Sequence, residues 1–241
     1  MKRVVVGPRA VTEAVRAHAG DVSAVYVQLD ARKALAEVAA EAQRRGVKVE
    51  ERTREELDAI AKGHKHQGVV AITGSYPYAE LADLVARAKA PPLLVALDEI
   101  TDPHNFGAIV RSAVAFDADG VITLKHRAAP VTPVVVRASA GATEHARIAR
   151  VTNLARTLES LSDEHGMQVV GLAGEGDVEI DRLPPAPEGR VLVIGAEGKG
   201  LRRLVREKCT LLARIAHPGP VASLNASVAA SIALFSAWRQ R

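Results

Sequence analysis

The sequence predicts an α/β protein whose C-terminal part is built on a parallel sheet. Short apolar runs alternate with amphipathic helical patterns along most of the 241 residues. Residues 93–97 form one continuous apolar run, which is typical of a strand buried on both faces of a parallel sheet. Glycine- and proline-rich turns separate the runs. Strands that alternate with helices give a parallel sheet with helices on both of its faces.

The N-terminal part, residues 1–73, is expected to form a compact α/β domain. Its elements in chain order are a helix at 9–19, a strand at 22–28, a helix at 31–45, a strand that begins at 47, a helix at 54–61 and a strand at 69–73. Gly46 directly follows the second helical pattern, where a C′ glycine ends a helix.

Residues 74–92 are expected to link this domain to a second one at 93–241. Pro77, Pro91 and Pro92 surround a single helical pattern at 80–88, and the proline pair ends it. In the second domain, strands are expected at 93–97, 120–124, 168–173, 190–194 and 210–215, and helices at 106–116, 155–165, 201–208 and 223–240.

Composition restricts the class of protein. The net charge of +4 and the pI of about 9.4 favour a polyanionic partner. Aromatic residues make up only 3%, which argues against an RNA module that stacks bases on exposed rings. The one cysteine, Cys209, excludes a disulfide framework and is expected to be an inert core residue. With no signal peptide pattern and no membrane-length apolar run, we expect a cytoplasmic protein.

The first motif spans residues 98–111, between a predicted strand and a predicted helix. Asn105 falls where the N-cap of that helix would lie, and Arg111 follows six residues later. Taken alone, Asn105 could be a cap, and Arg111 could be a solvated or ion-paired helix residue.

The second motif, residues 195–201, is a glycine-rich turn between a strand and a helix. Its spacing fits neither the dinucleotide-binding pattern nor the P-loop pattern. Glu197 in its centre would repel a phosphate and suits a hydroxyl group or a cation better. The simpler interpretation is a tight turn without a ligand.

The third motif, residues 215–225, contains the turn 218–220 and leads into the last helix. Ser223 and Asn225 suit a helix start, and also a pocket that binds a polar ligand. Ligands of parallel sheets bind outside the carboxyl ends of the strands. All three motifs follow predicted strands, so they are expected at one edge of the sheet.

In this order, the three motifs resemble those of the SpoU (SpoU/TrmH) family of RNA ribose 2′-O-methyltransferases. Residues 7–14 and 66–69 resemble the small, L30e-like RNA-binding domain of the RlmB subgroup, which methylates a guanosine in 23S rRNA. The resemblance implies a SPOUT trefoil-knot domain at 93–241 that binds S-adenosylmethionine. It also implies a homodimer whose active site takes residues from both subunits. Separately, the spacing of cysteine, histidine and acidic residues leads us to expect no metal.

The resemblance also assigns roles to individual residues. The active-site positions that it implies are Asn105, Arg111, Glu197, Ser223 and Asn225. The cofactor-binding positions that it implies are Gly195, Ile215 and Leu224. In the family, the residue at position 111 is proposed as a general base, although an arginine pKa above ~12 makes its neutral form costly. A second account has Arg111 bind the adjacent RNA phosphate, and in both accounts a lysine fails, because it lacks the planar fork.

Three other functions remain open at this point. The same chemistry could act on tRNA or on an antibiotic-target rRNA nucleotide. The chain could be a non-catalytic rRNA-binding assembly factor, or an α/β enzyme that binds a nucleotide phosphate at the loop after Gly195.

Several basic segments are candidates for RNA contacts. In the N-terminal domain the basic residues are Arg3, Arg9, Arg16, Arg44, Arg45, Lys48, Lys62, His64 and Lys65. The turn at 64–67 could bind a metal, but the sequence places no cysteine or acidic residue at ligand spacing, which favours an RNA contact or an exposed loop. Lys125, His126 and Arg127 follow a predicted strand and could meet phosphate or form a solvated face.

Overall fold

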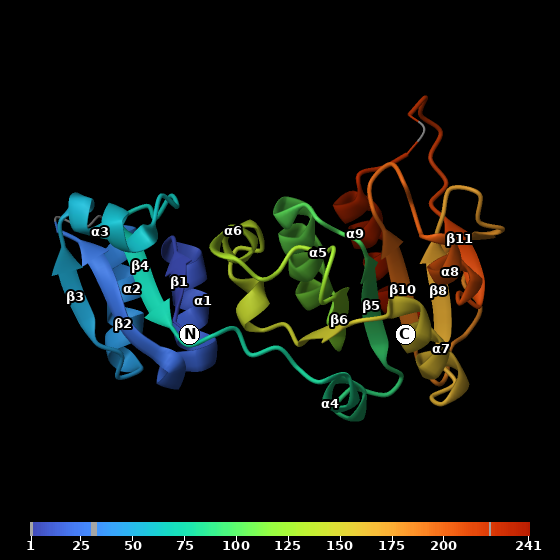
Figure 1. The fold of residues 1–241 in the computed structure, drawn as a ribbon, viewed down its shortest axis with the longest axis horizontal. Helices are drawn as coiled ribbons and strands as arrows, with labels where there is room; N and C mark the ends of the chain where they lie inside the picture. Colours follow the sequence, from blue (N-terminus) through green and yellow to red (C-terminus); the bar gives the residue numbers. More distant parts are fainter. Residues whose placement is uncertain (1, 30–32, 222) are drawn as a thin grey trace. The chain divides into compact units, whose positions relative to one another are not determined.

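The computed structural model describes residues 2–29, 33–221 and 223–241, and Figure 1 shows its ribbon. The chain forms two compact units. The first consists of the residues up to Pro77 together with Val131–His145, and the second of Tyr78–Pro130 with Ala146–Arg241. In the part of the chain that is described, no helix has both the length and the apolar character needed to cross a membrane.

The first unit has a mixed four-stranded sheet in the order β1-β4-β2-β3. Its strands are β1 (Arg3–Val6), β2 (Val22–Gln28), β3 (Val49–Arg52) and β4 (Val69–Thr73), and its helices are α1 (Pro8–His18), α2 (Lys33–Arg44), α3 (Arg54–Ala61) and α6 (Pro133–Ala138). β4 pairs antiparallel with β1 and β2, and β2 pairs parallel with β3. Residues 31 and 32 of the expected second helix lie outside the described residues.

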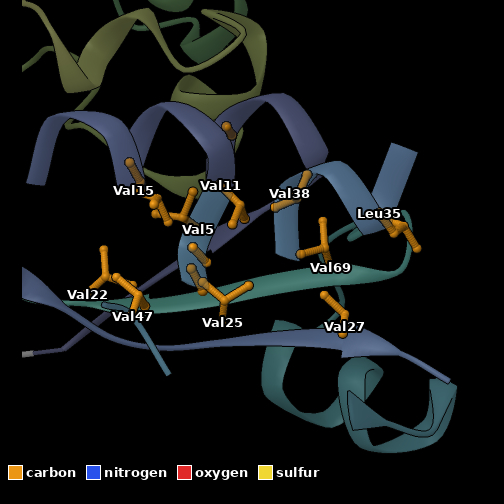
Figure 2. Close-up of a cluster of buried hydrophobic side chains, with 14 of the residues drawn as sticks. Val5, Val11, Val15, Val22, Val25, Val27, Leu35, Val38, Val47 and Val69 are labelled. Carbon is orange, nitrogen blue, oxygen red and sulfur yellow. The ribbon is translucent and has the colours of Figure 1, made fainter. Parts of the chain in front are cut away.

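The side chains of this sheet alternate between two apolar layers. Val5 and Val69 pack with the residues of α1 and α2 in the cluster of Figure 2, whereas their neighbours Val6 and Val70 pack against Leu57 of α3 on the other face. This alternation is the period-two pattern of a strand covered on both faces. The helices therefore enclose the sheet.

The segment 131–145, which the sequence pattern placed in the C-terminal domain, contacts the first unit. Val136 of α6 belongs to the core cluster of that unit. Glu144 is buried and accepts hydrogen bonds from both terminal nitrogens of Arg3, at 2.8 and 2.5 Å. The Tyr76 hydroxyl donates to the carbonyl of Thr143 at 2.7 Å. The chain thus passes between the two units at three points rather than through a single linker.

The turn before β4 is braced by a buried histidine. His66 Nδ1 accepts a hydrogen bond from the backbone N–H of Gly68 at 3.1 Å, and Nε2 lies 3.0 Å from an Asp58 carboxylate oxygen. Both ring nitrogens therefore have protein partners. Within the described residues, no group of three or more His, Cys, Asp or Glu is placed to hold a metal ion.

The second unit contains a seven-stranded sheet in the order β7-β6-β5-β10-β8-β11-β9. Every neighbouring pair is parallel, as the sequence predicts. Its strands are β5 (Leu93–Asp98), β6 (Gly120–Leu124), β7 (Ile148–Val151), β8 (Gln168–Leu172), β9 (Val178–Glu179), β10 (Arg190–Gly195) and β11 (Leu211–Arg214). β5 is buried along its whole length.

Helices cover both faces of this sheet. They are α4 (Leu81–Ala86), α5 (Pro103–Ala115), α7 (Leu154–Asp163), α8 (Arg203–Glu207) and α9 (Ala226–Arg239). Leu84 of α4, Leu158 of α7 and Val205 of α8 share one core with Leu94 and Val193 of the sheet. On the other face, α5 packs on β6 and α9 packs on β10, and α5 and α9 pack on each other.

Cys209 lies at the edge of this core and behaves as the sequence predicts. Its thiol donates to the carbonyl of Val205 at 3.4 Å. Burial raises the pKa of the thiol to about 12. The thiolate, which is the reactive form, is therefore suppressed at neutral pH.

Candidate active site

The three motifs meet at the carboxyl edge of the parallel sheet. β5 and β10 are neighbours in register, with Gly195 opposite Asp98. The first motif follows β5, the second follows β10, and the third follows β11. This is the edge at which ligands of parallel α/β sheets bind.

The first motif begins with a cap that the sequence pattern misplaced. Asp102, not Asn105, is the N-cap of α5, and its carboxylate accepts from the backbone N–H groups of His104 and Asn105 at 3.0 and 3.3 Å. Pro103 at the first helical position fixes φ and lacks the N–H that would go unpaired there. Because Asp102 caps the helix, the buried Asn105 side chain is free to bond elsewhere.

The second motif is a loop that closes on itself. The backbone N–H of Gly200 donates to the carbonyl of Ala196 at 2.8 Å. Gly198 and Gly200 have φ of 76° and 63°, which favours glycine. A Cβ at Gly195 would lie 2.3 Å from the Gly200 carbonyl carbon, so this position has no room for a side chain. The closed loop carries the exposed Glu197.

A buried carboxylate holds the end of this loop. Asp98, at the end of β5, is fully buried. It accepts hydrogen bonds from the Arg202 backbone N–H at 2.8 Å and from Arg202 Nε at 2.7 Å. This pair joins the first motif to the second, and sequence reasoning missed it. The signal was present, since an acidic residue directly after a fully apolar strand has to find a partner.

The third motif supplies the cap of α9, and the helix begins at Ala226 rather than at Ser223. Asn225 Oδ1 accepts from the N–H groups of Ser227 and Val228, at 2.9 and 3.4 Å. Because the side-chain oxygen of Asn225 caps the helix, the side-chain nitrogen is left to bond the other two motifs. It donates to Asn105 Oδ1 at 3.0 Å and lies 3.5 Å from Glu197 Oε2.

Asn105 completes a hydrogen-bonded cluster of one residue from each motif. Its amide nitrogen donates to Glu197 Oε2 at 3.3 Å. One carboxylate oxygen thus accepts from two amides. No described residue donates to the other oxygen of Glu197, so it is available to a ligand. We call Asn105, Glu197 and Asn225 the amide–carboxylate cluster.

A cavity of about 410 Å³ opens beside this cluster, a size typical of small-molecule sites, which span roughly 300–1,000 Å³. Its walls are formed by the ends of β8, β10 and β11 and by the loops that follow them. Glu197, Ser223 and the three expected cofactor residues, Gly195, Ile215 and Leu224, all line it. Asn105 and Asn225, which bond Glu197, are not part of the lining.

Arg111 lies away from this cluster in its own chain. It is exposed, and it does not line this cavity. Six residues turn an α-helix through about 600°, so Arg111 and Asn105 occupy different faces of α5. Among the described residues, Arg111 has no hydrogen bond or ion pair. Of the five expected active-site residues, the monomer brings together the other four.

Two family models match the chain. The model of the SpoU rRNA Methylase family matches residues 92–235, which is more than half of the chain. The chain belongs to the SpoU rRNA methylase family. A second model, for the substrate-binding domain of RNA 2′-O ribose methyltransferases, matches residues 4–79.

Curated relatives agree with this assignment. An uncharacterized tRNA/rRNA methyltransferase of Mycolicibacterium gilvum (strain PYR-GCK) is 46% identical over 246 residues, which cover 99% of this chain and 76% of the relative. A similarly named protein of Mycolicibacterium smegmatis is 46% identical over 243 residues, with the same coverage. Both names leave tRNA and rRNA undistinguished.

Solved structures confirm the fold. The SpoU methyltransferase AviRb from Streptomyces viridochromogenes, in complex with AdoMet, matches all of this chain and 90% of its own, with a TM-score of 0.81 and 28% identity. An rRNA methyltransferase from Sinorhizobium meliloti matches 99% of this chain and 87% of its own, with a TM-score of 0.78 and 28% identity. The expected fold, a SPOUT α/β knot domain with a small N-terminal α/β domain, is therefore correct.

The family also identifies the cofactor as S-adenosylmethionine. The lining of the cavity also suits this molecule. The glycine-rich loop brings backbone close to the interior, and Ile194, Leu201 and Ile215 give apolar walls for a purine ring. The SpoU match and the AdoMet complex favour this cofactor over the nucleotide phosphate that was one alternative for the loop.

Proposed function

We propose that this RNA methyltransferase methylates the 2′-hydroxyl of a ribose, and that its target is a guanosine of 23S rRNA. The observation that carries the proposal is the amide–carboxylate cluster, which presents an open carboxylate oxygen beside the cofactor cavity. The choice of guanosine in 23S rRNA rests on the RlmB-like segments 7–14 and 66–69. The same enzyme class acting on tRNA or on an antibiotic-target rRNA nucleotide is the alternative.

The chain's own residues would position the reacting hydroxyl. When bound, S-adenosylmethionine supplies a methyl group that its sulfonium already activates. The remaining requirement is alignment of the ribose oxygen and removal of its proton. Asn105 and Asn225 fix Glu197 Oε2, which leaves Oε1 to accept from the ribose hydroxyl or from a guanidinium group. Ser223 lies on the cavity wall, where its hydroxyl can bond the sugar.

We further propose that the enzyme is a homodimer in which Arg111 acts in the active site of the other subunit. Large apolar side chains lie exposed on α9: Val228, Ile232, Phe235 and Trp238. We call them the α9 face. The rings of Phe116, Phe235 and Trp238 lie within 6.3 Å of each other, centroid to centroid. A contiguous exposed apolar patch of this kind is typical of a protein interface.

The α9 face and Arg111 belong to two packed helices. Ser112, next to Arg111 on α5, shares a 2.7 Å hydrogen bond with Ser231 of α9. A second copy that covers the α9 face would therefore also lie close to α5. Such an arrangement would supply the partner that Arg111 lacks in its own chain, and it makes the site incomplete in a monomer.

A charge in the α9 face is expected to separate the dimer. We predict that Phe235→Asp raises the dimer dissociation constant by roughly 30-fold or more, because a desolvated aromatic contact is lost and a carboxylate is buried. The rate of methyl transfer should fall in proportion to the fraction of the protein that is dimeric. Sedimentation velocity over a concentration series measures the first effect, and labelled methyl transfer the second.

The matched control is Leu29→Asp, which introduces the same charge at a similarly exposed apolar residue of the first unit. Phe235 is 48% exposed and Leu29 is 43% exposed. Leu29→Asp should remain dimeric. A Phe235→Asp protein that sediments like the wild type would contradict the proposed interface.

The proposed activity is tested with unmodified RNA. Pure protein is incubated with S-adenosylmethionine carrying a labelled methyl group and with transcripts of 23S rRNA, 16S rRNA and tRNA. We expect label in 23S rRNA alone, on the 2′-oxygen of one guanosine, mapped by nuclease protection and mass spectrometry. Label in tRNA, or on another nucleoside, would contradict the proposed target, but the proposed methyl transfer to RNA would still hold.

Calorimetry with S-adenosylmethionine separates catalysis from a purely structural role. Binding of the cofactor with transfer to RNA supports the proposal, whereas no heat at millimolar cofactor would favour a non-catalytic rRNA-binding factor. We also propose that the enzyme works in the cytoplasm, where rRNA is available and a lone free cysteine stays reduced.

A further inference from the structure

A second cavity, of about 450 Å³, lies at the carboxyl edge of the same sheet. Its walls come from the segments that follow β6 and β7, from the start of α7 and from the segment 202–205 before and within α8. Leu201 lines the cofactor cavity and the next residue, Arg202, lines this one, so both cavities adjoin the end of the loop 195–201. We call it the arginine cavity.

The lining of the arginine cavity combines positive charge with an apolar surface. Its cations are Arg127, Arg202 and Arg203, and none of the described residues that line it is acidic. Ala155 and Leu204, which is 56% exposed, give it an apolar surface above the buried Leu154 and Val205. This mixture suits a nucleotide, which presents a phosphate together with an apolar base face.

Two of the three guanidinium groups can accept another anion. Arg127 contacts Glu99 at 3.1 Å and Arg203 contacts Glu207 at 2.6 Å, but their side chains are 71% and 76% exposed. Exposed ion pairs contribute little, and each guanidinium has five N–H donors. A phosphate can therefore bind without breaking a costly contact. Arg202, by contrast, is committed to Asp98 and Glu99.

The backbone around the cavity is held in unusual conformations. Glu99 and Arg127 both have positive φ, at 57° and 59°, although neither is glycine. Such conformations cost free energy and concentrate at ligand sites. Arg127 lines the cavity, and its guanidinium pairs with the Glu99 carboxylate at 3.1 Å.

We propose that the arginine cavity binds the RNA strand next to the nucleotide that is methylated, with one phosphodiester at Arg127 and Arg203 and a sugar or base on the Leu204 wall. This inference rests on the proposed function, since it takes RNA as the substrate. It adds a subsite in the catalytic unit, apart from the substrate-binding domain at residues 4–79. The subsite adjoins the loop that carries Glu197, so a strand bound there passes beside the cofactor cavity.

The test compares two arginines that differ in position and little else. Arg203 and Arg182 have side chains that are 76% and 77% exposed, and each pairs with one glutamate on its own segment. We expect Arg203→Ala to raise the Kd for unmodified 23S rRNA about 3–10-fold and to reduce the slope of log Kd against log salt by about 0.7, the value for one phosphate of a single strand. Arg182→Ala should change neither quantity.

The double variant Arg127→Ala/Arg203→Ala should weaken RNA binding by about 10–100-fold if the two effects add. Calorimetry with S-adenosylmethionine should give the wild-type affinity for all variants, which shows that the loop and the fold are intact. In methyl-transfer assays at varied RNA concentration, the KM of these variants for RNA should rise by a larger factor than kcat falls.

In this experiment RNA binding tests the proposed subsite, and methyl transfer tests the proposed function. If Arg203→Ala and Arg182→Ala bind rRNA equally well, the subsite is wrong, whether or not the wild type transfers methyl groups. If the wild type binds rRNA but transfers nothing, the proposed function fails, and the Kd comparison still decides the subsite. If the arginine variants lose affinity only for an acidic protein partner and not for RNA, the assignment to RNA is overturned.

Discussion

Arg111→Ala is expected to lower kcat for methyl transfer by about 10²–10³-fold, the usual loss when one group that stabilises a transition state is removed. The affinity for S-adenosylmethionine should stay at the wild-type value, because Arg111 does not line the cofactor cavity. The protein should also remain folded, since Arg111 is exposed and has no bond to the described residues of its own chain. Single-turnover transfer and calorimetry measure the two quantities.

Arg111→Lys separates charge from geometry. In both accounts the planar guanidinium is held in a fixed orientation, which a lysine ammonium cannot reproduce, so the lysine variant should fail nearly as completely as the alanine variant. A lysine enzyme with near wild-type kcat would mean that position 111 supplies only a positive charge. That result would contradict both accounts of the residue.

Mixed dimers test whether Arg111 acts across the subunits. Arg111→Ala and Glu197→Ala subunits, each of which we expect to be inactive as a homodimer, are co-expressed with different tags and purified as the mixed species. One of its two sites would then combine an intact Arg111 with an intact Glu197, and about half of the wild-type activity per dimer should return. If Arg111 acted in the active site of its own chain, both sites of the mixed dimer would be inactive. An inactive mixed dimer would therefore contradict the shared site.

Sequence periodicity predicted the second unit well, because a parallel sheet buries its central strands on both faces. β5, β6, β8 and β10 were visible as apolar runs for this reason. β7 and β9 are not among the predicted strands, since they have only four and two residues. β1 is not predicted either, because its four residues are identified as a strand only by their pairing with β4. The run Val134-Val135-Val136 is β-branched and resembles a strand, but Thr132 and Pro133 begin a helix there.

The site was predictable to the extent that its residues lie in order along the sequence. The loops after β5, β10 and β11 had to meet at one edge once the sheet was known to be parallel, and this brought Asn105, Glu197 and Asn225 together. The N-cap of α5 was harder to predict, since Asp102 and Asn105 are both good N-cap residues and only the structure shows which of them caps the helix. The apolar run before Asp98 indicates that this carboxylate needs a partner, but no local pattern identifies Arg202, which lies 104 positions away, as that partner.

The strongest test of the cofactor loop is Gly195→Ala. The new Cβ would lie 2.3 Å from the Gly200 carbonyl carbon, 2.5 Å from its oxygen and 2.6 Å from the Leu201 nitrogen. All three are backbone atoms, so no side chain can rotate away and the loop itself has to open. Forcing a methyl group into packed structure costs about 1–3 kcal/mol.

Because the loop is a wall of the cofactor cavity, this cost should appear as weaker binding of S-adenosylmethionine, by about 5–150-fold in Kd. Gly174→Ala is the matched control. Gly174 lines the same cavity, yet a Cβ there would meet no atom within 4 Å. Its variant should bind the cofactor like the wild type. If calorimetry gave the two alanine variants equal affinity, the closed loop would not be what shapes the cofactor site, and the carboxylate of Glu197 would have to be positioned by Asn105 and Asn225 alone.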